Sequence, residues 1–196
     1  MAEQLHTDCP WTGNDALMTE YHNYEWGIPV HDDVKLFEFL VLEGFQAGLS
    51  WKIILHKREN FRKAFDNFDA KKIAHYDEDV VQGLMKDASI VRNQLKIRAT
   101  IANAKALLQV QREFGSFDKY IWQFTGGETR INHWQTMTEL PCKTPLSDAM
   151  SKDLLKRGFK FVGSTICYSF MQAVGMVDDH LESCSRKVNE SKLVDK

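Results

Sequence analysis

The sequence lacks any long hydrophobic run. No apolar segment among its 196 residues is long enough to span a bilayer. The first ten residues are polar and do not contain the apolar stretch of a signal peptide. We therefore expect a cytoplasmic protein that does not associate with membranes, in a compartment where thiols stay reduced.

Cysteine is also scarce. The four cysteines are Cys9, Cys142, Cys167 and Cys184, and this spread does not resemble a disulfide framework. Two of them are paired with a histidine: Cys9 with His22, and Cys184 with His180. The spacing of His180 and Cys184 predicts that they share one face of a helix. Together the two pairs make a Cys2His2 set, which suits a closed, structural zinc site and would require the two chain ends to meet.

The chain shows no alternating strand pattern, no repeat and no low-complexity tract. Helical periodicity dominates instead, with Asp32, Asp69, Asp77 and Asn93 at starting positions. The expected helices cover residues 34–42, 51–65, 69–74, 77–86, 93–113, 117–124, 147–157 and 165–174. Residues 125–143 carry Gly126, Gly127 and Pro141 and are expected to form an irregular loop. The predicted fold class is all-α.

The net charge is −2, which alone argues weakly against a nucleic-acid partner. Basic residues nevertheless gather in three segments, 52–63, 92–105 and 152–160. These segments are either ordinary solvated helix faces or parts of one basic surface. Residues 77–108 read as helix, short turn, helix, so amide groups at the second helix start, with Arg92 and Lys96, can contact a phosphate. The alternative is an ordinary helical hairpin.

Glu43 stands inside an otherwise apolar helix. A buried carboxylate needs a partner or a cavity, because an unpaired buried charge is costly. Trp11, Tyr21, Trp26 and Trp51 make this part of the chain unusually aromatic. Either these side chains form core with an Arg or Lys paired to Glu43, or they form a pocket for a flat, positively charged ligand.

Four blocks of sequence resemble the DNA-3-methyladenine glycosylase I family. They are residues 21–29 (YHNYEWGIP), 42–51 (LEGFQAGLSW), 57–62 (KRENFR) and 156–173 (KRGFKFVGSTICYSFMQA). The resemblance extends from about Cys9 to Cys184. It implies a helix-hairpin-helix DNA glycosylase fold, with residues 77–108 as the hairpin unit. It also implies a structural zinc held by Cys9, His22, His180 and Cys184, and no organic cofactor.

The resemblance further implies an activity. The enzyme would act as a monomer on alkylated double-stranded DNA, flip out 3-methyladenine and release it as the free base, without a lyase step. Residues 51–113 would form the subdomain with the hairpin. Residues 1–50 and 114–196 would form a discontinuous terminal subdomain with the zinc site and part of the base pocket.

The resemblance also assigns roles to individual residues. Glu43 would recognise the base, Trp51 would stack on it and Tyr21 would complete the pocket. Further pocket contacts would come from Trp11, Trp26 and Ser169. Leu49 would be the apolar wedge that fills the gap left in the DNA stack.

One position departs from the family pattern. Ser89 stands where the hairpin usually has glycine, so we expect a weaker phosphate contact or a strained turn. Residues 93–112 contain no acidic side chain, and in this the sequence resembles the 3-methyladenine enzymes.

Two other functions remain open. One is a catalytically inactive helix-hairpin-helix DNA-binding module stabilised by zinc, and the other is a zinc hydrolase with Glu182 as its general base.

Overall fold

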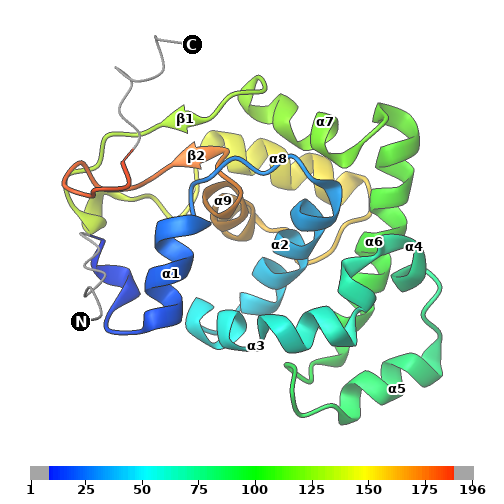
Figure 1. Ribbon diagram of the computed structural model, residues 1–196. Helices are drawn as coiled ribbons and strands as arrows, with labels where there is room; N and C mark the ends of the chain where they lie inside the picture. Colours follow the sequence, from blue (N-terminus) through cyan, green and yellow to red (C-terminus); the bar gives the residue numbers. More distant parts are fainter. Residues whose placement is uncertain (1–8, 188–196) are drawn as a thin grey trace.

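The computed structural model describes residues 9–187, which form a mostly helical body (Figure 1). Short 3-10 turns join the longer elements. The helices are α1 (Ala16–Tyr24), α2 (Asp33–Gln46), α3 (Trp51–Ala64), α4 (Ala70–Ile73), α5 (Glu78–Lys86), α6 (Gln94–Phe114), α7 (Phe117–Trp122), α8 (Pro145–Lys156) and α9 (Ser164–Ala173). Within residues 9–187, every helix is too short or too polar to traverse a lipid bilayer. The all-α prediction is confirmed in its main part.

Polar side chains start the helices where the sequence predicts. Asp32, Asp69, Asp77 and Asn93 each accept a hydrogen bond from a backbone amide in the first turn of α2, α4, α5 and α6, respectively. Such caps satisfy amides that have no partner inside the helix. The boundaries of α5, α6 and the turn between them therefore follow from local chemistry.

Helix α2 is the centre of the core. Every residue from Leu36 to Phe45 is buried, as expected for a helix that is apolar on nearly all sides. Helices α3, α6, α7 and α9 pack around it (Figure 1). Because Glu43 belongs to this buried stretch, the surrounding helices determine what its carboxyl group meets.

Two local predictions are wrong. The expected loop 125–143 includes strand β1 (Arg130–Ile131), which pairs in parallel with β2 (Val177–Asp178). The segment from His180 to Cys184 is not helical, since Leu181 bridges to Trp134 and the amide of His180 binds the Asp178 carboxylate. Both features depend on pairing between distant segments, which periodicity does not reveal. Helix α1, capped by Asp15, also lies outside the predicted helices.

Candidate active site and metal centre

A hollow of about 210 Å³ lies beside the middle of the molecule and is walled by aromatic rings. Its lining side chains come from the start of the chain, from α1, α2, α3 and α9, and from the segment after β1. They are Trp11, Tyr21, Trp26, Glu43, Gln46, Trp51, Met137, Leu140, Ser169 and Gln172. A concave, mostly apolar site with a few polar groups is the usual form of a small-molecule pocket.

Glu43 is the acidic group of this hollow. The residue is only 4% exposed, and its Oε2 atom has no hydrogen-bond partner among residues 9–187. No lysine or arginine of that range forms an ion pair with it. Burial raises the pKa of the Glu43 carboxyl from 4.5 to about 8. The protein surroundings of Glu43 therefore favour the neutral carboxyl group at pH 7, rather than the carboxylate expected from the sequence.

The aromatic wall leaves a second polar atom unused. The indole Nε1 of Trp51, the first residue of α3, is buried without a hydrogen-bond partner in the part of the chain that the structure describes. Tyr21 lies beside it, with ring centroids 5.3 Å apart, and Trp11 and Trp26 meet edge-to-face at 5.1 Å. Burial, followed by the charge of Glu43, raises the pKa of the Tyr21 hydroxyl well above its usual range. The pocket thus offers flat surfaces and two unpartnered polar atoms to a ligand.

The structure brings together the six residues expected to form the pocket: Trp11, Tyr21, Trp26, Glu43, Trp51 and Ser169. The sequence reading missed Gln46 and Gln172. Each follows a recognised pocket residue by three positions on the same helix, so helical spacing was the available signal. It also missed Met137 and Leu140, which lie in irregular chain and carry no periodic signal.

A second hollow of about 190 Å³ adjoins the first, because both are lined by Glu43, Gln46 and Ser169. It is also lined by Leu49 of the turn between α2 and α3, which is 38% exposed. The turn at Leu49 therefore lies next to the aromatic pocket.

The two ends of the described chain meet at a cluster of metal-ligand type. One ligand atom each from Cys9, His22 and Cys184 lies within 4.8 Å of the others, and all three residues are buried. The Nε2 atom of His22 is 3.5 Å from the Cys184 sulfur. Helix α1 and the segment after β2 accordingly lie on the same side of the molecule (Figure 1). A Cys-His-Cys triad is therefore positioned for a metal ion.

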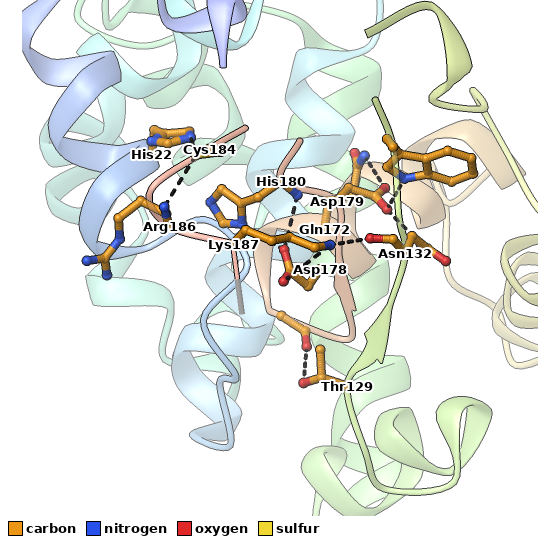
Figure 2. Close-up of polar contacts among 12 residues, drawn as sticks. His22, Thr129, Asn132, Gln172, Asp178, Asp179, His180, Cys184, Arg186 and Lys187 are labelled. Atoms are coloured by element: carbon orange, nitrogen blue, oxygen red, sulfur yellow. Dashed lines mark hydrogen bonds and ion pairs between the residues drawn. The ribbon is translucent and has the colours of Figure 1, made fainter. Parts of the chain in front are cut away.

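His180 borders this triad with one nitrogen unused. Its ring centroid is 4.9 Å from that of His22. Its Nδ1 lies 2.7 Å from Asp178 Oδ1, whereas its Nε2 is buried without a partner among the described residues (Figure 2). A carboxylate on one histidine nitrogen, with the other nitrogen unpartnered, is the usual arrangement around a metal-binding histidine. Among the described residues, the group whose ligand atoms lie within 4.8 Å of one another is Cys9, His22 and Cys184, and His180 lies beside it.

A buried carboxylate connects the pocket to the segment after β1. Asp179 accepts hydrogen bonds from Tyr168 (2.6 Å) and Trp134 (2.8 Å). Gln172 (2.8 Å) and Asn132 (2.7 Å) also donate to it (Figure 2). Four donors satisfy a charge that is only 1% exposed. The network fixes Gln172 on α9 and the chain that leads to Met137 and Leu140.

The comparisons with known proteins show the family of this chain. A family model described as "Methyladenine glycosylase" matches residues 11–187. The chain belongs to the methyladenine glycosylase family. DNA-3-methyladenine glycosylase 1 of Escherichia coli K12 is 49% identical over 176 residues, which cover 90% of this chain and 94% of that protein. The DNA-3-methyladenine glycosylase of Haemophilus influenzae is 44% identical, over 94% of this chain and 100% of that protein.

A solved member of the methyladenine glycosylase family has a very similar structure. It is a tyrosine-to-phenylalanine variant of a 3-methyladenine DNA glycosylase I in complex with 3-methyladenine. Its TM-score with this chain is 0.90, at 32% identity, over 92% of this chain and 97% of that one. The expected family and its fold are thus confirmed.

In the present chain, the predicted hairpin turn connects α5 to α6. Ser89 does not have a positive φ, so the serine causes no strain of the kind expected where glycine is usual. Its amide donates to Asp87 Oδ1 (2.8 Å), and Lys57 Nζ binds the carbonyl of Ser89 (2.9 Å). Arg92 is exposed beside this turn. The turn is therefore held by Asp87 and by Lys57 of α3, and the amide of Ser89 is already bound.

Lys96 does not lie where its predicted role needs it. The residue is buried, and its ammonium group donates to the carbonyl oxygens of Phe45 (2.8 Å) and Ala47 (2.6 Å). These bonds direct the charge toward the end of α2 instead of toward the hairpin turn. Its geometry does not support the predicted contact with a phosphate, and Arg92 is left as the exposed cation of the expected pair.

Proposed function

We propose that this chain is a monofunctional DNA-3-methyladenine glycosylase that hydrolyses the bond between 3-methyladenine and deoxyribose in alkylated double-stranded DNA. The supporting observation is the aromatic hollow in which Glu43 Oε2 and Trp51 Nε1 are both buried without a partner. Such atoms are costly unless a ligand satisfies them. Two relatives named for the same activity, at 49% and 44% identity, support the substrate.

The chemistry requires little acid catalysis. Methylation at N3 makes adenine cationic within the nucleotide, so the base is already a good leaving group. Cleavage yields a neutral base and a sugar with oxocarbenium character, which water then attacks. The protein has to extrude the nucleotide, stack the base on Trp51 in the pocket that Tyr21 completes, and orient the sugar.

Selectivity follows from the charge of the lesion. A cation beside Glu43 favours the ionised carboxylate and lowers its pKa, so the damaged base produces the charge that holds it. The faces of the Trp11, Tyr21 and Trp51 rings add attraction for a cation. Normal adenine brings no charge to the site and leaves the carboxyl group neutral.

The DNA-binding surface belongs to the same proposal. Leu49, which lines the second hollow, enters the stack when the nucleotide leaves it. The hairpin contacts the phosphate backbone of the DNA at Ser89 and Arg92. Residues 51–113 form the subdomain that carries this hairpin. Residues 9–50 and 114–187 form the terminal subdomain with the metal site and part of the pocket, and the remainder of the predicted ranges 1–50 and 114–196 lies outside the described residues. The enzyme acts as a monomer in the cytoplasm and releases free 3-methyladenine.

We also propose that the metal is a structural zinc ion held by Cys9, His22, His180 and Cys184. A bound ion would supply a cross-link between the two terminal segments. Four protein ligands leave no open position, which argues against the zinc hydrolase alternative. The candidate base of that alternative, Glu182, lies 2.8 Å from His133 Nδ1.

Release of 3-methyladenine from methylated duplex DNA tests the proposed function. We expect the wild-type protein to release the base and Glu43→Gln to release it much more slowly, because glutamine cannot carry the charge that complements the lesion. Glu128→Gln, an exposed position, serves as the control. A folded wild-type protein that binds DNA but releases no base would support the inactive DNA-binding module instead.

A further inference from the structure

Lys96 links the hairpin helix to the end of α2. It lies in the first turn of α6, immediately after the hairpin turn, and is 7% exposed. Its two acceptors, the carbonyls of Phe45 and Ala47, belong to the last turn and the C-cap of α2. Carbonyls at a helix end have no partner inside the helix and carry its negative partial charge. The buried ammonium group of Lys96 donates hydrogen bonds to these carbonyls and places a positive charge at the negative end of the helix.

The end of α2 depends on this contact. In α1, α3, α5 and α6 the amide of the C-cap residue returns to a carbonyl of the last turn, whereas none is found for Ala47 in the described structure. The chain leaves α2 through Ala47 in an extended conformation (ψ 113°) and Gly48 with φ +79°. Leu49 then turns back, with its amide on the carbonyl of Gln46. Lys96 is therefore the cation that holds this turn.

The α2–α3 turn that Lys96 binds lies between residues that line the two hollows. Gln46, just before it, lines the aromatic pocket, and Leu49 lines the adjoining hollow. Trp51 follows directly and starts α3. Lys57 of α3 also reaches the hairpin, at the carbonyl of Ser89, whereas Lys96 binds the backbone of the α2–α3 turn itself. No carboxylate among residues 9–187 pairs with the Lys96 ammonium, and burial lowers its pKa.

We propose that Lys96 is a positioning residue that fixes residues 46–50 against the hairpin helix, so that Leu49 is presented to the duplex at the place where the hairpin holds its backbone. This role rests on the proposed glycosylase function. The ammonium touches neither base nor phosphate and acts through the backbone of the α2–α3 turn. The wedge is needed only when a nucleotide must leave a paired stack, so the effect depends on the substrate strand.

The test compares one methylated oligonucleotide as duplex and as single strand. Lys96→Met removes the ammonium at nearly constant length, and Lys105→Met is the matched control at an exposed position of α6. Single-turnover release of 3-methyladenine is normalised to the folded fraction. We expect Lys96→Met to lower the duplex rate roughly tenfold to a hundredfold more than the single-strand rate, as for a small misplacement near a reacting group. An equal loss on both substrates, or no loss, would overturn the role.

A double variant and a second readout complete the test. In a Leu49→Ala background, Lys96→Met should cause no further selective loss on duplex, and an additive selective loss would contradict the mechanism. Lys96→Gln removes the charge and keeps a side-chain NH2 group as donor. If Lys96→Met does not fold, release of 3-methyladenine from duplex and single strand is measured in Lys96→Gln. Amide hydrogen exchange at residues 47–50 should speed up in Lys96→Gln and stay unchanged in α8. Unchanged amide exchange at residues 47–50 would refute the proposed role of Lys96 in holding the turn. A wild-type protein that releases no base would refute only the glycosylase function.

Discussion

Glu43 is a carboxyl group whose surroundings favour the neutral acid. Burial raises its pKa from 4.5 to about 8 in the folded protein, while the unfolded chain keeps the ordinary value. Between these two pH values the folded state binds a proton that the unfolded state has lost. The free energy of unfolding must then decrease as the pH rises through this range, and the decrease ends above about pH 8.

We predict that Glu43→Gln removes this pH dependence. At pH 5 the variant and the wild type should have similar stability, because both carry a neutral side chain. At pH 9 the variant should be more stable by roughly 3–5 kcal/mol, given about 1.4 kcal/mol per pKa unit. Urea unfolding at several pH values measures the difference. Glu128→Gln should follow the wild-type curve, and a Glu43→Gln curve parallel to the wild type would disprove the raised pKa.

Trp51 contributes both a ring face and an N–H group to the pocket. We predict that Trp51→Ala weakens binding of free 3-methyladenine by about 1–3 kcal/mol, the range for stacking of a base on an aromatic side chain. Trp51→Phe keeps one aromatic ring for stacking but removes Nε1 and part of the ring surface, so it should lose less than Trp51→Ala. Calorimetric titration with the free base measures both losses. Undiminished affinity in Trp51→Ala would place the base elsewhere.

At the scale of the element, sequence reasoning succeeded where the determining groups are neighbours along the chain. Asp32, Asp69, Asp77 and Asn93 start their helices through amides two or three residues away. It failed from His180 to Cys184, where the conformation depends on Asp178 and on pairing with Trp134. The spacing still pointed to Cys184 of the Cys-His-Cys triad, although the helical geometry assumed for the pair was wrong.

The same distinction explains the candidate site. Glu43 and Trp51 stand out because a carboxyl group in an apolar helix and a cluster of indoles are visible in the sequence. Met137 and Leu140 do not stand out, because only the tertiary fold brings their irregular segment to the pocket. Lys96 was misplaced for a related reason: the sequence shows its charge, but not the distant carbonyls that accept from it.

The side chain of Asp33 in α2 forms hydrogen bonds to the start of α7. Both Asp33 carboxylate oxygens accept hydrogen bonds from it: Oδ2 binds the amide of Phe117, and Oδ1 binds that of Asp118, each at 2.8 Å. A third bond comes from Gln111 on α6 (2.7 Å). Asp33 thus satisfies amides of the first turn of α7 from more than eighty residues away along the chain.

We predict that Asp33→Ala lowers the free energy of unfolding by about 2–3 kcal/mol, because hydrogen bonds to a charged group are worth more than neutral ones. Release of 3-methyladenine by the folded variant should remain close to that of the wild type, since Asp33 does not line the pocket. Urea unfolding at pH 7 is the measurement. Asp79→Ala, at an exposed first-turn position of α5, should change stability by less than about 0.5 kcal/mol. Equal effects of the two substitutions would contradict the role of Asp33.

At the scale of the whole molecule, the metal centre and the pocket share a wall. The ring of Trp11 lies 5.4 Å from that of His22, and the ring of Trp26 lies 4.6 Å from that of His180. Trp11 and Trp26 also line the pocket. The residues that hold the two chain ends together therefore support two of the rings expected to enclose the base.

Loss of the metal should then affect base binding as well as stability. We predict that the purified protein contains about one equivalent of zinc, and that chelation or Cys184→Ser lowers both the melting temperature and the affinity for free 3-methyladenine. Cys142→Ser, an exposed cysteine away from the cluster, should change neither. Metal analysis, thermal unfolding and calorimetric titration provide the three readouts. Should the metal-free protein bind the base as tightly as the loaded one, the shared wall carries no coupling, and the metal serves only to join the two ends of the chain.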